Sequence, residues 1–152
     1  MELSLHSLYE MIRKTGKDLT NTSPLKADVK VATVSNLNNL YGVQTIDGVA
    51  LVVGDKVLVK DQTDKTQNGI YLVQSEAWIR SFDFDTPETI VMNSFCLIET
   101  GTINFHSMFM MINPVPVTLG VTEIIWEQLS GPNKPAKFIP TSDIGGNIWI
   151  SD

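Results

Sequence analysis

The feature of this sequence that most constrains the fold is a series of short apolar runs separated by turn residues. The runs are rich in β-branched and aromatic side chains, and dipeptides such as Asp47-Gly48, Gly54-Asp55 and Asn68-Gly69, which favour tight turns, stand between them. Short runs of this composition, bounded by turn chemistry, predict β-strands, and many of them at close spacing predict a barrel or a sandwich. The predicted strands are 29–33, 49–53, 56–60, 70–73, 78–80, 90–92, 95–98, 105–112 and 123–126.

The chain divides into three parts. Residues 1–27 form a predicted helix and linker, residues 28–131 a β-rich domain, and residues 132–152 a linker with a C-terminal strand or tail. A helix is predicted because apolar residues near the N-terminus recur at a spacing that places them on one helical face. These residues are Leu5, Leu8, Tyr9 and Ile12. The predicted fold is mainly β: a small antiparallel β-barrel or sandwich with a short N-terminal amphipathic helix.

Composition restricts the class of partner. The 152 residues carry a formal net charge of −6, and 43% of them are hydrophobic, which is typical of a folded chain. Nucleic acid and anionic membrane are disfavoured as partners, because binding to either requires clustered lysine and arginine. The single cysteine, Cys96, allows no disulfide within the chain and suits synthesis in a reducing cytoplasm.

Several side chains could carry metal or catalytic chemistry, but their spacing matches no known constellation. Asp61, Asp64 and Asn68, or Asp83 and Asp85, could supply oxygen ligands, yet neither set has the spacing of a calcium-binding loop. Cys96 lies in an apolar run, which is typical of a buried and unreactive thiol. We therefore expect no enzymatic activity, no cofactor and no metal.

The stretch from Val43 to Val73 resembles a domain found in phage tail-fibre, tail-spike and other virion-associated proteins. That family combines an Asp-Gly-Val turn, a Gly-Asp-x-Val-Leu-Val-Lys strand, a Gln-Thr-Asp loop and a Gln-Asn-Gly-Ile-Tyr strand, followed by tryptophan, arginine and two aspartates. The matching positions are Asp47, Gly48, Val49, Gly54, Asp55, Val57, Leu58, Val59, Lys60, Gln62, Thr63, Asp64, Gln67, Asn68, Gly69, Ile70, Tyr71, Val73, Trp78, Arg80, Asp83 and Asp85. The resemblance covers about residues 28–131, and it departs from the family in the Met-rich run 104–112.

The resemblance implies a structural component of a bacteriophage tail or tail fibre that acts as an attachment or connector module. It implies a homotrimer, contact with other tail or baseplate proteins, synthesis in the bacterial cytoplasm and a final location in the virion. Two alternatives stay open. One is a receptor- or glycan-binding module, in which Trp78 and Trp126 would contact a host surface glycan. The other is an assembly factor that is absent from the finished particle.

The sequence also suggests which residues meet a partner. The run from Met108 to Ile112 is apolar at every position, which is typical of a strand that is covered on both faces or that packs against another subunit. A helix of about 12 residues is marginal in water by itself, so the apolar face near the N-terminus must also dock on this domain or on a partner. The predicted interface residues are Leu5, Leu8, Tyr9, Ile12, Met108, Met110, Met111 and Trp149.

Overall fold

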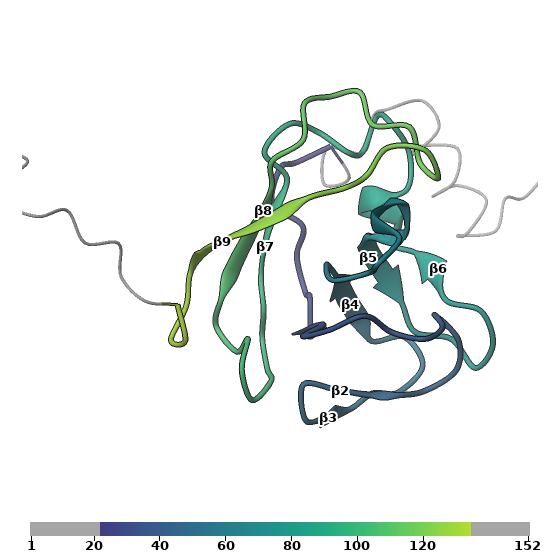
Figure 1. Ribbon diagram of the computed structural model, residues 1–152, viewed down its shortest axis with the longest axis vertical. Helices are drawn as coiled ribbons and strands as arrows, with labels where there is room; N and C mark the ends of the chain where they lie inside the picture. Colours follow the sequence, from purple (N-terminus) through teal and green to yellow (C-terminus); the bar gives the residue numbers. More distant parts are fainter. Residues whose placement is uncertain (1–21, 135–152) are drawn as a thin grey trace, which may run out of the picture.

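The computed structural model describes residues 22–134, which form three small β-sheets (Figure 1). The strands are β1 (Val31–Ala32), β2 (Thr45–Ile46), β3 (Val49–Ala50), β4 (Lys56–Val59), β5 (Gly69–Leu72), β6 (Ile79–Arg80), β7 (Phe95–Leu97), β8 (Met108–Met111) and β9 (Trp126–Ser130). Two single-turn 3₁₀ helices, η1 (Lys65–Gln67) and η2 (Phe82–Phe84), are the helical elements of this part of the chain. None of its helices is long and apolar enough to cross a membrane. The prediction of a mainly β chain is confirmed.

The four-stranded sheet β1-β4-β5-β6 is covered on both faces. Successive side chains of a strand point to opposite faces, and β4 supplies apolar residues to both of them. Leu58 joins the core cluster shared with the sheet β7-β8-β9, whereas Val57 and Val59 join the cluster beneath the β2-β3 hairpin. The four-stranded sheet thus has the hairpin cluster on one face and the cluster shared with the three-stranded sheet on the other. Figure 1 shows the hairpin β2-β3 below β4 and the sheet β7-β8-β9 to the left of it.

The hairpin β2-β3 is tied to the rest of the molecule by the residue that begins its turn. Asp47 and Gly48 both have positive φ, of 49° and 78°, as a tight two-residue turn requires. The carboxylate of Asp47 accepts hydrogen bonds from the backbone N–H groups of Ile103 and Asn104, each at 2.8 Å. The side chain of Asn104 then donates to the carbonyl of Thr33, next to β1, at 3.1 Å. One turn residue therefore connects the hairpin, the β7–β8 connection and the central sheet.

Side chains of the polar loop between β4 and β5, together with Arg80, bond to backbone groups of the loop and of a neighbouring segment. The amide of Asn68 accepts from the N–H of Gln62 at 3.0 Å and donates to the carbonyl of Ile124 at 2.9 Å. The guanidinium of Arg80 donates to the carbonyls of Thr66 and Asn68, each at 3.0 Å. These contacts explain Asn68 and Arg80 as structural residues of the motif, since the side chain of each pairs with backbone groups.

Three sequence predictions need correction. The sheets are not entirely antiparallel, because β1 pairs with β4 in parallel, and the bridges Leu25–Phe95 and Val29–Ile98 are parallel as well. No closed barrel forms within residues 22–134. Residues 90–92 form no strand, because the chain turns there, with the backbone N–H of Ser94 donating to the carbonyl of Val91 at 3.2 Å. The predicted N-terminal helix and Trp149 lie outside the described residues.

Candidate interaction surface

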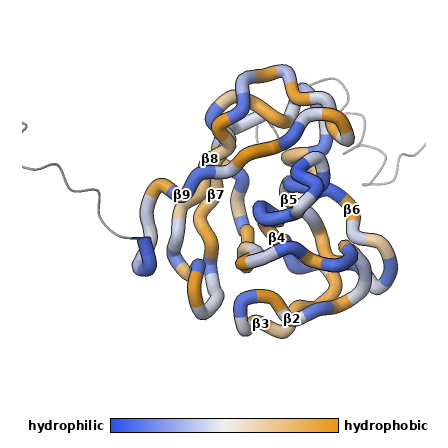
Figure 2. The backbone as a smooth tube through the Cα atoms, viewed as in Figure 1, coloured by the Kyte–Doolittle hydropathy of each residue, from blue (hydrophilic) through white to orange (hydrophobic). Residues whose placement is uncertain are grey.

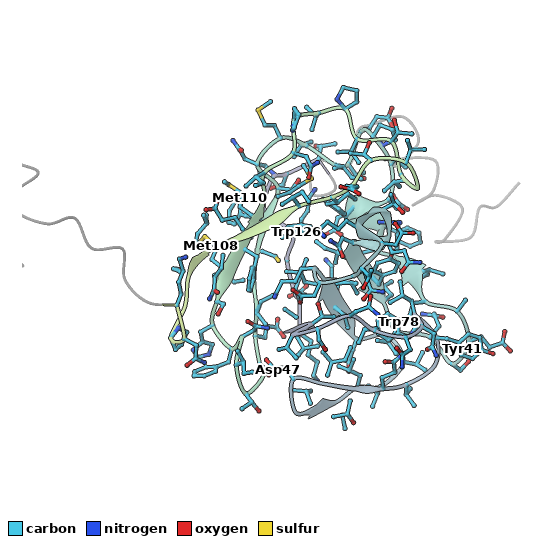
Figure 3. All side chains as sticks on the ribbon, in the orientation of Figure 1. Tyr41, Asp47, Trp78, Met108, Met110 and Trp126 are labelled. Atoms are coloured by element: carbon cyan, nitrogen blue, oxygen red, sulfur yellow. The ribbon has the colours of Figure 1, made fainter. Side chains whose placement is uncertain are left out.

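The two faces of strand β8 have different surroundings. Met111 is fully buried in the main core and Phe109 is 3% exposed, whereas Met108 and Met110 are only partly buried. This alternation of burial follows from the period of two in a β-strand. Met111 was predicted to meet a partner, but it lies in the core and offers no surface. Met108 and Met110 remain accessible, and Figure 3 labels both on the β7-β8-β9 sheet.

Neighbouring strands extend this apolar surface. Phe95 pairs with Met110 and Leu97 pairs with Met108, so the four side chains share one side of the sheet. Leu97 is 50% exposed, and Ile112, two residues beyond Met110 and 47% exposed, continues the same alternation. We call Phe95, Leu97, Met108, Met110 and Ile112 the outer face. Figure 2 shows the hydrophobic residues along β7. A contiguous apolar patch of this kind is typical of an interaction site.

The outer face borders an open sheet edge. On the β7 side, the chain around Leu25 closes the edge, because the N–H of Lys26 donates to the carbonyl of Phe95 at 2.8 Å. On the other side, β9 has no further strand beside it within residues 22–134. An edge strand presents unpaired N–H and C=O groups that can pair with another chain. The outer face and the β9 edge together form a surface suited to a protein partner.

The two tryptophans proposed to contact glycans are differently placed. Trp78 is 7% exposed, and its indole N–H donates to the carbonyl of Gly42 at 2.7 Å, so its ring belongs to the core under the hairpin. Trp126 is partly buried and its ring packs on Phe84, with 5.4 Å between ring centroids. Neither ring is an open stacking platform, and Trp78 lies across the molecule from the outer face (Figure 3). The structure does not bring them together as a sugar-binding site.

Charged residues gather beside the core, and of these the sequence had singled out only Asp83 as a candidate for chemistry. The ammonium group of Lys56 lies 2.7 Å from the carboxylate of Asp83, which also accepts from the hydroxyl of Ser81 at 2.6 Å. Lys26 is fully buried, and its ammonium group donates to the carbonyl of Thr89 at 2.8 Å. Burial lowers the pKa of Lys26 to about 8, although the nearby carboxylate of Asp83 opposes this change. No periodicity in the sequence identifies this cluster, because long-range pairing assembles it.

The groups considered for chemistry show no catalytic arrangement. Cys96 is fully buried, as predicted, and burial raises the pKa of its thiol to about 12, which keeps it protonated. Asp83 is engaged by Lys56 and Ser81, and Asp61 accepts from the hydroxyl of Thr33 at 2.8 Å. Within residues 22–134, no group of three or more His, Cys, Asp or Glu side chains is arranged to hold a metal ion.

Comparison with known proteins gives this chain no relatives: no family model, no curated protein and no solved structure matches it. The resemblance to phage tail domains therefore stays a prediction from the sequence motif.

Proposed function

We propose that this chain is a non-enzymatic structural module of a bacteriophage tail or tail fibre, and that it attaches to its neighbours through the outer face. The observation that carries the proposal is the difference in burial between the two faces of the three-stranded sheet. One face contributes Cys96, Phe109 and Met111 to the core, while the other leaves Met110 and Leu97 accessible. Burying exposed apolar surface against a partner removes it from water, which makes the free energy of association more favourable.

The second part of the proposal concerns architecture. We propose that the four-stranded and three-stranded sheets pack as a small sandwich. The main core cluster supports this arrangement, because it joins Leu58 and Ile70 of the first sheet to Phe109 and Met111 of the second. In such a sandwich the outer face of the thinner sheet has no third layer. A second subunit would supply that layer.

The partner proposed is a further copy of the chain, in a homotrimer, together with other tail or baseplate proteins. The motif resemblance favours three copies of the chain in the assembly and a location in the virion. The geometry supplies a face and an adjoining edge on β9, where Glu127 and Leu129 are exposed. Methionine side chains suit this role, because they adapt to an irregular opposing surface.

The receptor-binding alternative has no comparable support. Sugar recognition by aromatic rings needs an exposed ring face, and Trp78 is 7% exposed with its indole N–H already bonded to the backbone. The partly buried Trp126 has its ring against Phe84. The outer face consists mostly of aliphatic and methionine side chains, with Phe95 as its one aromatic residue, which favours a protein surface over a glycan.

The test is the solution mass of the full chain, measured by size-exclusion chromatography with light scattering over a range of concentrations. The proposal predicts a mass three times that of the 16.8 kDa chain. A mass of one chain at every concentration contradicts self-association. Mass spectrometry of purified virions then separates a virion component from an assembly factor, since only the former stays in the particle.

A further inference from the structure

A cavity of about 800 Å³ lies against the four-stranded sheet, and none of the five outer-face residues lines it. Its apolar wall includes Leu25, Leu72 and Phe82, and Leu25 is 44% exposed. Its charged wall contains four carboxylates and two lysines: Asp28, Asp55, Asp83, Glu99, Lys30 and Lys56. The cavity thus combines apolar surface with an excess of negative charge.

The two lysines of the cavity are already paired. Lys56 lies 2.7 Å from Asp83, and Lys30 lies 3.8 Å from Asp55. The two carboxylates that remain, on Asp28 and Glu99, are exposed and form no ion pair within residues 22–134. The cavity is therefore matched to an occupant that is partly apolar and carries positive charge.

One segment of this chain has that chemistry and joins the cavity directly. We propose that residues 1–21 of the same chain occupy the cavity. Their apolar residues include Leu8 and Ile12, and the basic residues Arg13, Lys14 and Lys17 follow closely. The positive charge is local to residues 13–17, because Glu2, Glu10 and Asp18 balance it over the whole segment. The apolar residues would lie against Leu72 and Phe82, and the basic residues would face Asp28 and Glu99.

The position of the chain favours this occupant over a separate molecule. Ser23 lines the cavity, so the residues that precede it leave from the cavity wall itself. Lys17 is six residues before Ser23, and an extended chain of that length spans at most about 20 Å. A tethered segment meets the site at high effective concentration, which a free ligand does not. The outer face then remains available for another subunit.

Disulfide trapping in the full chain tests the proposal. The double variant Ile12→Cys with Leu72→Cys places one thiol in the segment and one on the cavity wall. The control, Ile12→Cys with Val121→Cys, places the second thiol at a position that is 72% exposed and belongs neither to the cavity wall nor to the outer face. The native Cys96 adds little background, because it is fully buried and its thiol stays protonated. Lys30→Cys offers a second position on the cavity wall if the Leu72 variant folds poorly.

We expect an intrachain disulfide to form at least about tenfold faster in the cavity variant than in the control. Adding Asp28→Lys and Glu99→Lys should slow that reaction several-fold, because the reversed charges repel Arg13, Lys14 and Lys17. Equal rates in the cavity and control variants overturn the proposal. A disulfide that forms only between chains also overturns it, because the segment would then occupy another copy. Neither outcome bears on the outer face, which the solution mass tests separately.

Discussion

The two larger sheets are built from similar short strands but bury them differently. In the four-stranded sheet, Leu58 faces one core cluster while Val57 and Val59 face another, so both surfaces of β4 are covered by the chain itself. In the three-stranded sheet, Phe109 and Met111 face the core while Met108 and Met110 remain accessible. The four-stranded sheet is therefore buried within the chain on both faces, whereas the three-stranded sheet is buried on one face only.

The difference in burial between the two sheets shows which strand faces are constrained by packing within the chain and which face is accessible to a partner. A strand covered twice accepts few changes on either face, because each substitution leaves a cavity or an unpaired group. A strand covered once tolerates changes on its open face unless a partner fills it. Apolar strand residues can therefore belong either to the core or to an interaction surface, and only their burial distinguishes the two cases.

The largest effect is expected when the doubly covered sheet is broken. Leu58→Ala should lower the free energy of unfolding by about 2–5 kcal/mol, because a fully buried leucine leaves a cavity. Leu97→Ala, at a half-exposed position of the thinner sheet, should cost less than about 0.5 kcal/mol. Urea denaturation at low protein concentration measures both. Similar losses for the two variants would remove the distinction between the sheets.

The next effect concerns the link between the layers. Asp47→Ala removes a carboxylate that accepts two backbone hydrogen bonds and places alanine at φ 49°, so it should cost about 2–4 kcal/mol. Asp47→Asn keeps a side-chain acceptor and a residue that tolerates this backbone, so its loss should be smaller. Asp64→Ala, which removes the exposed cap of the 3₁₀ turn η1, is the control and should lower the thermal midpoint by less than Asp47→Ala does. A midpoint for Asp47→Ala as high as that of the control would exclude the link.

A smaller effect is expected from pH, at the edge of the scaffold. The pKa of Lys26 is about 8 in the folded chain and near 10.5 when unfolded, so the unfolded chain binds more protons between these values. Stability from this group therefore rises with pH across that window, by up to about 1.4 kcal/mol per pH unit. Lys26→Met is the reference protein for these stability measurements. The raised pKa of Cys96 lowers stability as the pH rises above 9, and this contribution cancels because both proteins keep Cys96. Parallel stability curves for the two proteins between pH 8 and 10 would contradict the burial of the ammonium group.

The smallest effect on folding is expected on the outer face. Met110→Lys should change the free energy of unfolding of the dissociated chain by less than about 0.5 kcal/mol, because the side chain is accessible and a lysine can extend into water. The measurement is denaturation at a concentration where the chain is dissociated, since association adds stability by mass action. A loss of several kcal/mol would show that Met110 belongs to the core.

Sequence reasoning was strongest where the determinants are local. The turn at Asp47-Gly48 and the strand at 56–60 were predicted because the necessary residues are adjacent in the chain. Asn68-Gly69 was read as a tight turn and is not one: Asn68 has φ −62°, its amide is buried, and Gly69 begins β5. A long-range contact with Ile124 selects that conformation, and no local pattern reports it.

The same limit applies to the candidate surface. The run Phe95-Cys-Leu-Ile is apolar throughout, so the sequence predicted a buried strand, and only the pairing with β8 shows that Phe95 and Leu97 point outward. Met111 was grouped with Met110 for the same reason. The parallel pairing of β1 with β4 depends on contacts across 26 residues of chain, from Val31 to Val57, which propensity does not encode.

If the outer face holds this chain to its partner, as we propose, a charge placed on that face should dissociate the assembly. The solution mass of Met110→Lys should be determined beside that of the wild-type chain, at equal concentration, by light scattering. The account predicts a multiple of 16.8 kDa for the wild type and the mass of one folded chain for the variant. An associated wild type whose mass is unchanged by Met110→Lys would contradict the account, because the interface would then lie elsewhere.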